Sequence, residues 1–181
     1  QLLWLNLVTN GIQDVALAFE PGERGVLRRP PRPRGEGALS TTLWERTGVV
    51  ALVMAAGTLV MFRWTLDRTD SVTMAQTVAL TTLVVFQAFQ AGNARSESLS
   101  VFRMSPVSNP FLLLGTLGAL GLHTLALYLP PTQYVLRVEP IGLSEWVQVI
   151  VVAASILVAV EVHKALRRRA AAGATGAAEA T

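Results

Sequence analysis

The sequence contains no cysteine, few charged side chains and only two histidines. Without cysteine, a disulfide bond, a cysteine-ligated zinc site and a thiol nucleophile are all excluded. His123 and His163 lie far apart in the sequence and form no metal-binding motif. Charged residues make up 15% of the chain, and the net charge of +3 lacks the dense basic surface that nucleic-acid binding requires. These absences leave the apolar residues as the main signal.

Apolar residues make up 51% of the chain, and the mean hydropathy is +0.45. A membrane-spanning helix needs about 20 consecutive apolar residues. Five stretches approach that length, at residues 1–19, 44–64, 72–91, 110–129 and 146–162. They predict an all-α fold, an integral membrane bundle of five transmembrane helices that occupies residues 1–165. A soluble helical bundle is disfavoured because the second and fourth stretches are too apolar all round to present a face to water.

The segments outside these stretches predict how the chain is oriented. Residues 20–42 are rich in Pro, Gly and Arg and predict a loop, whereas the low-complexity tail, residues 166–181, predicts disorder. Cytoplasmic loops of membrane proteins carry an excess of Lys and Arg. If the loop at 20–42 is cytoplasmic, the other side of the membrane receives only Arg63, Arg68 and Arg137 of the 15 basic residues. This bias predicts an integral protein of the cell membrane with a cytoplasmic C-terminus.

The first apolar stretch contains a cluster of polar residues, within the segment NLVTNGIQD. At about 100° per residue these side chains share one arc of about 140° on a helix; they are Asn6, Thr9, Asn10, Gln13 and Asp14. Polar groups inside a bilayer face protein or a water-filled site, and their oxygens are the ligands that hard cations prefer. We therefore predict a cation site on this face, the alternative being hydrogen bonds between helices. Gly11 is predicted to loosen the helix there, so that backbone carbonyls join the side chains.

Other polar residues in the apolar stretches give weaker signals. Gln87 shares a face of the third stretch with two further glutamines and is the best candidate to supply one more oxygen, although a hydrogen bond between helices explains it equally well. His123 is alone in the fourth stretch, and we interpret it as a packing residue. Glu161 and Lys164 lie three residues apart at the end of the last stretch, which favours a helix-end ion pair.

The sequence also resembles a known family. The segment LLWLNLVTNGIQDVALAFEPGERGVLRRPPRP resembles the sixth transmembrane helix and following loop of P-type cation-transporting ATPases, in their calcium-pump-like branch. Three further segments are similar to later parts of the same family, in the same order; they are NARSESLSVFRMSP, LHTLALYLPPTQYVLRVEPIGLSEWVQVI and VEVHKALRR. The resemblance covers nearly the whole chain and implies that its five helices correspond to the sixth to tenth of a ten-helix membrane domain.

The resemblance also implies site residues. Asn6 and Thr9 match cation ligands of the family, whereas Asn10 stands where the family has an aspartate. Gln87 occupies the place of an acidic ligand in the eighth helix of calcium pumps. Asp14 lies one turn after Asn10, and we infer from the helical wheel that it replaces part of the missing charge. The reduced charge favours a single Ca²⁺, a monovalent ion or coupled protons over a site for two Ca²⁺.

The parts of a P-type ATPase that perform catalysis are absent from this sequence. It contains no D-K-T-G-T phosphorylation motif, nucleotide-binding domain or actuator domain, so no residue here is predicted to be catalytic, and ATP and magnesium would be ligands of the parent chain. In the family, the loop equivalent to residues 20–42 lies beneath the phosphorylation domain. The resemblance thus implies a coupling role for its arginines, and an anchor on anionic lipid is an equal alternative; they are Arg28, Arg29, Arg32 and Arg34.

Together these observations predict the C-terminal membrane domain of an ATP-driven cation pump. Its expected partners are the lipid bilayer, the transported cation, and the remaining transmembrane helices and phosphorylation domain of the parent pump. An alternative is a non-catalytic membrane scaffold or assembly subunit derived from the pump fold. A secondary transporter is disfavoured because such proteins repeat the broken helix in a second half, and no such repeat is visible here.

Overall fold

The computed structural model describes residues 1–21, 41–96 and 100–179, and in these ranges all regular elements are helices. The elements are α1 (Leu2–Val8), the π-helix η1 (Asn10–Asp14), α2 (Val15–Leu17), α3 (Thr41–Thr69), α4 (Val72–Ala94), the short 3₁₀ turns η3 (Val101–Arg103) and η4 (Pro106–Ser108), α5 (Pro110–Tyr128), α6 (Pro130–Leu136) and α7 (Leu143–Glu179). Four helices in the described part, α3, α4, α5 and α7, are long and apolar enough to cross a membrane. The prediction of an all-α membrane helical bundle is therefore confirmed, although the first of the five predicted spans, residues 1–19, forms the three short elements α1, η1 and α2 and is not among these four.

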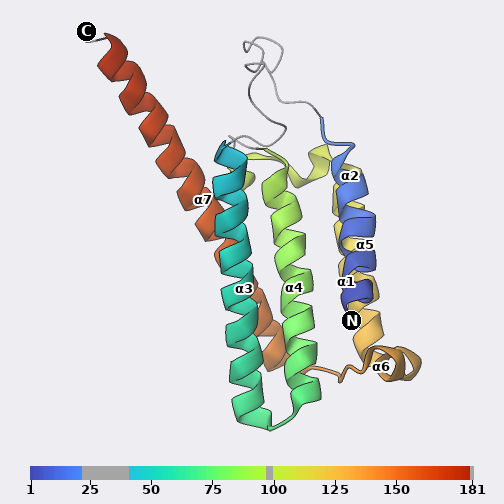
Figure 1. The fold of residues 1–181 in the computed structure, drawn as a ribbon. Coiled ribbons are helices and arrows are strands. Elements are labelled where there is room, and N and C mark those ends of the chain that lie inside the picture. The colour runs from blue at the N-terminus through green and yellow to red at the C-terminus, as the bar shows by residue number, and fades with distance from the viewer. Residues whose placement is uncertain (22–40, 97–99, 180–181) are drawn as a thin grey trace.

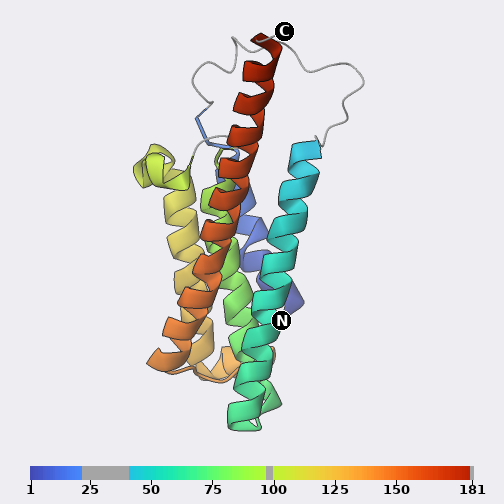
Figure 2. The same ribbon diagram turned by 90° about the vertical axis from the view of Figure 1, so that its left-hand side faces the viewer.

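The helices form two groups on either side of α4. Helices α3 and α4 run antiparallel side by side, and α7 crosses behind them (Figure 1). The first helix, made of α1, η1 and α2, lies beside α5 on the other side of α4. Figure 2 shows α7 running along the bundle and extending beyond the other helices at its C-terminal end. The short helix α6 lies across the opposite end.

The main apolar core lies between α3, α4 and α7. Phe86 of α4 and Ile156 of α7 are fully buried in it, together with Met61 of α3. Close packing depends on Gly57 of α3, because a Cβ atom at that position would lie 2.7 Å from the Phe86 ring and 3.1 Å from Val152. A glycine here lets the three helices approach one another where any other residue would push them apart.

Local sequence signals explain where the helices begin and end. Between α3 and α4 the chain turns at Asp70, whose φ of 51° lies in the left-handed region, and the Ser71 hydroxyl then accepts a hydrogen bond of 3.1 Å from the Met74 amide. Helix α5 begins with Pro110, and the Asn109 side chain caps it by accepting from the Leu112 amide at 2.9 Å. Both caps satisfy amide groups that a helix end leaves without a partner.

Several helices extend beyond the apolar stretches. Helix α3 continues to Thr69 and α4 to Ala94, while α6 forms within a segment that hydropathy interprets as a connector. Helix α7 reaches Glu179 and so includes most of the tail for which composition predicts disorder. Hydropathy predicts only the part of a helix that fits in the bilayer. The alanine-rich end of α7 has a high helix propensity, so the helix continues past the apolar part.

Candidate functional site

The first helix departs from α geometry at the polar cluster. The α-helix ends at Val8, and residues Asn10–Asp14 form a π-helix before α geometry resumes at Val15. Asn10 and Gly11 are poor helix formers, which makes this the weakest point of the stretch. The Thr9 carbonyl accepts from both the Ile12 and the Gln13 amides, at 3.3 and 2.8 Å. A π turn widens the helix and alters the pairing of its carbonyls, and such turns often occur at functional sites.

The polar residues of this helix face two directions. Thr9 and Gln13 are buried, whereas Asn6, Asn10 and Asp14 are exposed in this chain. The exposed three are spaced four residues apart and form one polar stripe, within which the Asn10 side-chain amide donates to the Asn6 side chain at 3.4 Å. We call these three residues the polar stripe. Its exposure means that no described part of the chain covers it.

Thr9 and Gln13 lie at the border between the polar stripe and the protein interior. The Thr9 hydroxyl donates to the Leu5 carbonyl at 2.7 Å and lies 3.3 Å from the Asn10 side-chain oxygen. Gln13 is only 2% exposed, and its side-chain nitrogen has no hydrogen-bond partner among the described residues. A buried donor without a partner is costly, which makes Gln13 an unusual residue for a purely structural position.

Gly115 of α5 allows a close approach to the π segment. A Cβ atom at this position would lie 3.1 Å from the Ile12 side chain and 3.7 Å from the Ile12 carbonyl oxygen. Neither hydropathy nor the helical wheel of the first helix predicts a role for this glycine. The signal was present in the repeat of glycines at 115, 118 and 121, because small residues along one helix allow a neighbouring backbone to approach.

Gln87 lies level with the π segment. On α4, Val84 packs against Val8, and Ala91 packs in the same small cluster as Ala16. Gln87 is therefore placed along α4 between these two contacts, and it is partly buried. Among the described residues it forms no hydrogen bond with the first helix, and the described residues also include no group of three or more His, Asp or Glu side chains that could hold a metal ion.

A second polar network joins three helices near the other end of the first helix. The Trp4 indole N–H donates to Nδ1 of His123 at 3.2 Å. The Nε2 atom of His123 lies 3.1 Å from the Thr81 hydroxyl, which donates to the Thr77 carbonyl at 2.8 Å. His123 is completely buried, as its interpretation as a packing residue implies, but its hydrogen bonds tie α1 to α4 and α5.

A third network holds the end of the first helix that follows the π segment. Arg95, just after α4, donates to both carboxylate oxygens of Glu20 at 3.0 Å or less. The Asn109 side chain donates to the same carboxylate at 2.9 Å and to the Ala16 carbonyl at 3.2 Å. Arg95 also donates to the carbonyl of Ser105 and to the hydroxyl of Ser108.

The charge of Glu20 depends on this network. Burial raises the pKa of Glu20, but the hydrogen bonds from Arg95 and Asn109 and the positive charge of Arg95 together outweigh it. The pKa of this carboxyl therefore lies below its ordinary value of 4.5. Glu20 stays ionised at neutral pH and fixes the end of the first helix against α4 and α5.

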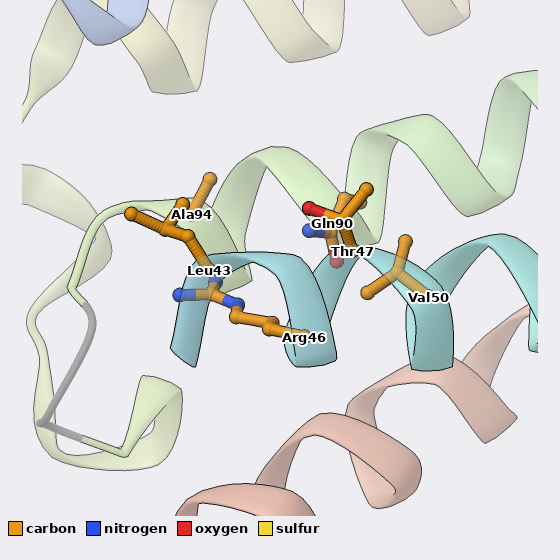
Figure 3. Close-up of a pocket in the computed structure, with 6 residues that line it drawn as sticks. All are labelled: Leu43, Arg46, Thr47, Val50, Gln90 and Ala94. Atoms are coloured by element: carbon orange, nitrogen blue, oxygen red, sulfur yellow. The ribbon is translucent and has the colours of Figure 1, made fainter. Parts of the chain in front are cut away.

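Helices α3 and α4 enclose a small pocket at the same end of the bundle. Its volume is about 260 Å³, and Figure 3 shows the lining residues on the two helices; they are Leu43, Arg46, Thr47, Val50, Gln90 and Ala94. The Arg46 guanidinium donates to the Asn93 carbonyl at 2.5 Å and to the Ser96 carbonyl at 3.4 Å. Arg46 thus caps the C-terminal end of α4, where a positive charge is favourable. The pocket contains none of the predicted cation ligands.

Charged residues of α7 connect it to α3 and to the segment before α5. Lys164 lies 4.0 Å from Glu161, so the predicted pair forms, but α7 continues beyond it to Glu179 and the pair does not mark the helix end. Glu161 also accepts from the Val101 amide at 3.0 Å, and Arg167 lies 3.2 Å from Glu45 of α3. These contacts lie away from the π segment. The predicted coupling arginines, Arg28, Arg29, Arg32 and Arg34, fall outside the described residues.

The structure thus brings the first-helix candidates together and adds residues that sequence reasoning missed. Thr9, Asn10 and Asn6 are linked by side-chain contacts, and Asp14 continues the polar stripe at the end of the π segment. Gly115 and the Glu20 network were missed. Glu20 lies 75 residues from Arg95 and 89 from Asn109, so no local pattern connects them.

Comparisons with known proteins place this geometry in a family. The family model described as "Cation transporting ATPase, C-terminus" matches residues 1–166. The chain is 33% identical over 168 residues to the "Probable cation-transporting ATPase F" of Mycobacterium tuberculosis. The matched region covers 93% of this chain and 19% of that relative.

Two eukaryotic relatives match over the same region. Identity is 31% over 169 residues to "Calcium-transporting ATPase 1" of Schizosaccharomyces pombe, covering 93% of this chain and 19% of that protein. It is 29% over 169 residues to human "Calcium-transporting ATPase type 2C member 1", covering 93% and 18%. The chain thus spans about a fifth of the length of these relatives. Since the family model covers nearly all of it, the chain belongs to the cation-transporting ATPase family, matching its C-terminal region.

Proposed function

We propose that the chain forms the C-terminal membrane domain of an ATP-driven cation pump, and that its first helix supplies part of the intramembrane cation site. The observation that carries this proposal is the coincidence of the polar cluster with the π segment Asn10–Asp14. Interrupted membrane helices bring backbone carbonyls and side-chain oxygens to the same place, which is how transporters bind cations in the bilayer.

The proposed ligands are the polar stripe together with Thr9. Asn6, Asn10 and Asp14 present two amides and one carboxylate on the exposed side of the first helix, and exposing them to hydrocarbon would be costly. We assign the remaining transmembrane helices of the parent pump to cover this stripe, with the described helices as the sixth to tenth. Gln87 lies at the same level on α4 and would need to reorient to contribute its oxygen.

The transported species would be a cation that tolerates a site of low negative charge. Two of the relatives carry "calcium-transporting" in their names. In this chain, however, Asn10 and Gln87 occupy places where the resemblance implies carboxylates, which leaves Asp14 as the carboxylate of the cluster. Because Ca²⁺ affinity rises with the charge of the ligands, the site favours a single Ca²⁺, a monovalent ion or coupled protons over two Ca²⁺.

The proposed mechanism is alternating access driven by phosphorylation in the parent chain. ATP and Mg²⁺ would act there, and the arginines of the loop at 20–42 would transmit the phosphorylation state to the first helix. The parent would be located in the cell membrane, with the Glu20–Arg95 network and the C-terminus on the cytoplasmic side. The π segment would be the element whose cation contacts differ between the two conformations.

The test uses the full-length protein that contains this chain. ATPase stimulation is measured across Na⁺, K⁺, Ca²⁺, Mn²⁺ and pH, first for the wild type and then for Asp14→Asn and Asn10→Ala. Asp67→Asn is the matched control, because it removes one carboxylate from an exposed position of α3. We expect both first-helix variants to change the cation concentration that gives half-maximal ATPase activity. The control should leave this concentration unchanged. Equal behaviour of Asp14→Asn and the control would contradict a ligand role for Asp14.

The alternative is a non-catalytic membrane scaffold that retains the pump-like helices. The discriminating observation is the reading frame upstream of Gln1. A D-K-T-G-T motif in the same frame supports the pump, whereas a start codon and a signal sequence directly before Gln1 support the scaffold.

A further inference from the structure

The buried imidazole of His123 joins the first helix to the rest of the bundle through two directional hydrogen bonds. Its Nδ1 atom lies 3.2 Å from the Trp4 indole nitrogen, and its Nε2 atom lies 3.1 Å from the Thr81 hydroxyl. An indole N–H can only donate, so Nδ1 must be the acceptor. The Thr81 hydroxyl already gives its hydrogen to the Thr77 carbonyl, so it accepts from Nε2–H.

Only the neutral form of His123 satisfies this pattern. A protonated imidazole carries hydrogens on both nitrogens and has no acceptor left for the Trp4 N–H. Protonation would therefore place two donors against each other at 3.2 Å, beside the fully buried His123 ring. The hydrogen bond between α1 and α5 would then be lost.

No neighbouring charge offsets this effect on the contacting helices. Helices α1, α4 and α5 contain no Asp, Glu, Lys or Arg, and besides His123 their titratable group is the Tyr128 phenol. Tyr128 donates to the Ile141 carbonyl at 2.7 Å. Glu139 touches the network only through its backbone amide, which donates to the Thr77 hydroxyl at 3.0 Å. Farther along the first helix, Asp14 lies about three turns from Trp4.

We propose that His123 is a positioning residue of the cation site: in its neutral form it fixes the first helix through Trp4, and its protonation releases that helix. Trp4 lies two residues before Asn6 and five before Thr9, so any shift of Trp4 moves the proposed ligands directly. This inference rests on the proposed function. It adds that acid weakens cation binding through a residue that contacts no cation.

The test compares three variants of the full-length protein between about pH 4 and about pH 8, a range that extends below the ordinary titration of histidine because the His123 ring is fully buried. His123→Gln keeps an acceptor for Trp4 and a donor for Thr81 but does not titrate. Trp4→Phe removes the donor, and His123→Leu removes both hydrogen bonds. The two readouts are the half-saturating cation concentration of the ATPase and the fluorescence of Trp4, taken as wild type minus Trp4→Phe.

We expect His123→Gln to have the same half-saturating cation concentration as the wild type at about pH 8. In acid this concentration should rise less in His123→Gln than in the wild type. Trp4→Phe and His123→Leu should raise the half-saturating cation concentration roughly threefold to tenfold at all pH values, which corresponds to losing one neutral hydrogen bond. Protonated histidine quenches a neighbouring indole, so the Trp4 fluorescence should fall with acid in the wild type and stay constant in His123→Gln.

Two results would overturn the inference. One is an identical pH dependence of the wild type and His123→Gln in the half-saturating cation concentration. The other is a Trp4 fluorescence that does not respond to acid. If the wild type shows no cation-stimulated ATPase at all, the proposed function fails instead. The fluorescence titration then still decides whether His123 holds Trp4.

Discussion

The two sides of α4 are packed by different physical means. Towards α3 and α7, α4 presents apolar side chains such as Val78 and Phe86, which are fully buried against α7 residues such as Ile156. Towards the first helix and α5, it presents Thr81, which bonds to His123. The first side is held by one large apolar core, whereas the second combines two small apolar clusters with a few directional hydrogen bonds.

This difference separates a scaffold from a part that can rearrange. Close-packed apolar interfaces tolerate little change in shape, whereas a hydrogen bond can be exchanged when a charge or a ligand arrives. The π segment, the buried side chain of Gln13 and the polar stripe all belong to the first helix, on the side with the hydrogen bonds. The proposed cation site therefore lies in the half of the bundle where small movements cost least.

The largest expected effect is on the close-packed side. Gly57→Leu would place a side chain against Phe86 and Val152, where a Cβ atom alone already lies within 3.1 Å of both. We expect a loss of about 3 kcal/mol in the free energy of unfolding, measured by thermal unfolding of the detergent-purified protein. Gly121→Leu is the control, because nothing lies within 4 Å of a Cβ atom at Gly121. Equal stability of the two variants would refute the tight-packing account.

Next in size is the network that fixes the end of the first helix. Arg95→Met removes the charged partner of the partly buried Glu20 carboxylate, and we expect a loss of about 2 kcal/mol at neutral pH. The control is Arg63→Met on the exposed face of α3. Because the pKa of Glu20 is lowered in the folded protein, the stabilisation is present at neutral pH and is lost as pH falls through that lowered pKa. Thermal unfolding of both variants should therefore converge in acid; a gap that persists there would show that Glu20 ionisation is not the cause.

A smaller effect is expected where α5 meets the π segment. Gly115→Ala adds a methyl group 3.1 Å from the Ile12 side chain, while Gly118→Ala meets nothing within 4 Å. We expect the first substitution to raise the half-saturating cation concentration of the ATPase about threefold, with little change in maximal rate, because it displaces the π segment without touching a ligand. Equal half-saturating cation concentrations in Gly115→Ala and Gly118→Ala would contradict this explanation.

Local patterns in the sequence account for part of this structure. Apolar stretches predict α3, α4, α5 and α7 because a bilayer demands a long apolar helix at each crossing. The helical wheel predicts one shared face for the five polar residues of the first helix, but a wheel does not say which neighbour covers each part of the arc. The structure buries Thr9 and Gln13 and leaves the polar stripe exposed.

The remaining features depend on contacts between distant residues. His123 was interpreted as a packing residue because nothing near it in the sequence is polar enough to suggest its partners, yet Trp4 lies 119 residues away. The Glu20 network likewise joins the ends of three helices. Such contacts follow from tertiary packing, which a single sequence does not specify.

The central claim is that the polar face of the first helix binds the transported cation. The most direct measurement is equilibrium binding of the stimulating cation to the full-length protein by isothermal titration calorimetry, comparing the wild type with Asp14→Asn and the control Asp67→Asn. The account predicts binding at least about tenfold weaker in Asp14→Asn and unchanged in the control. Wild-type affinity in Asp14→Asn, with the protein folded, would contradict it.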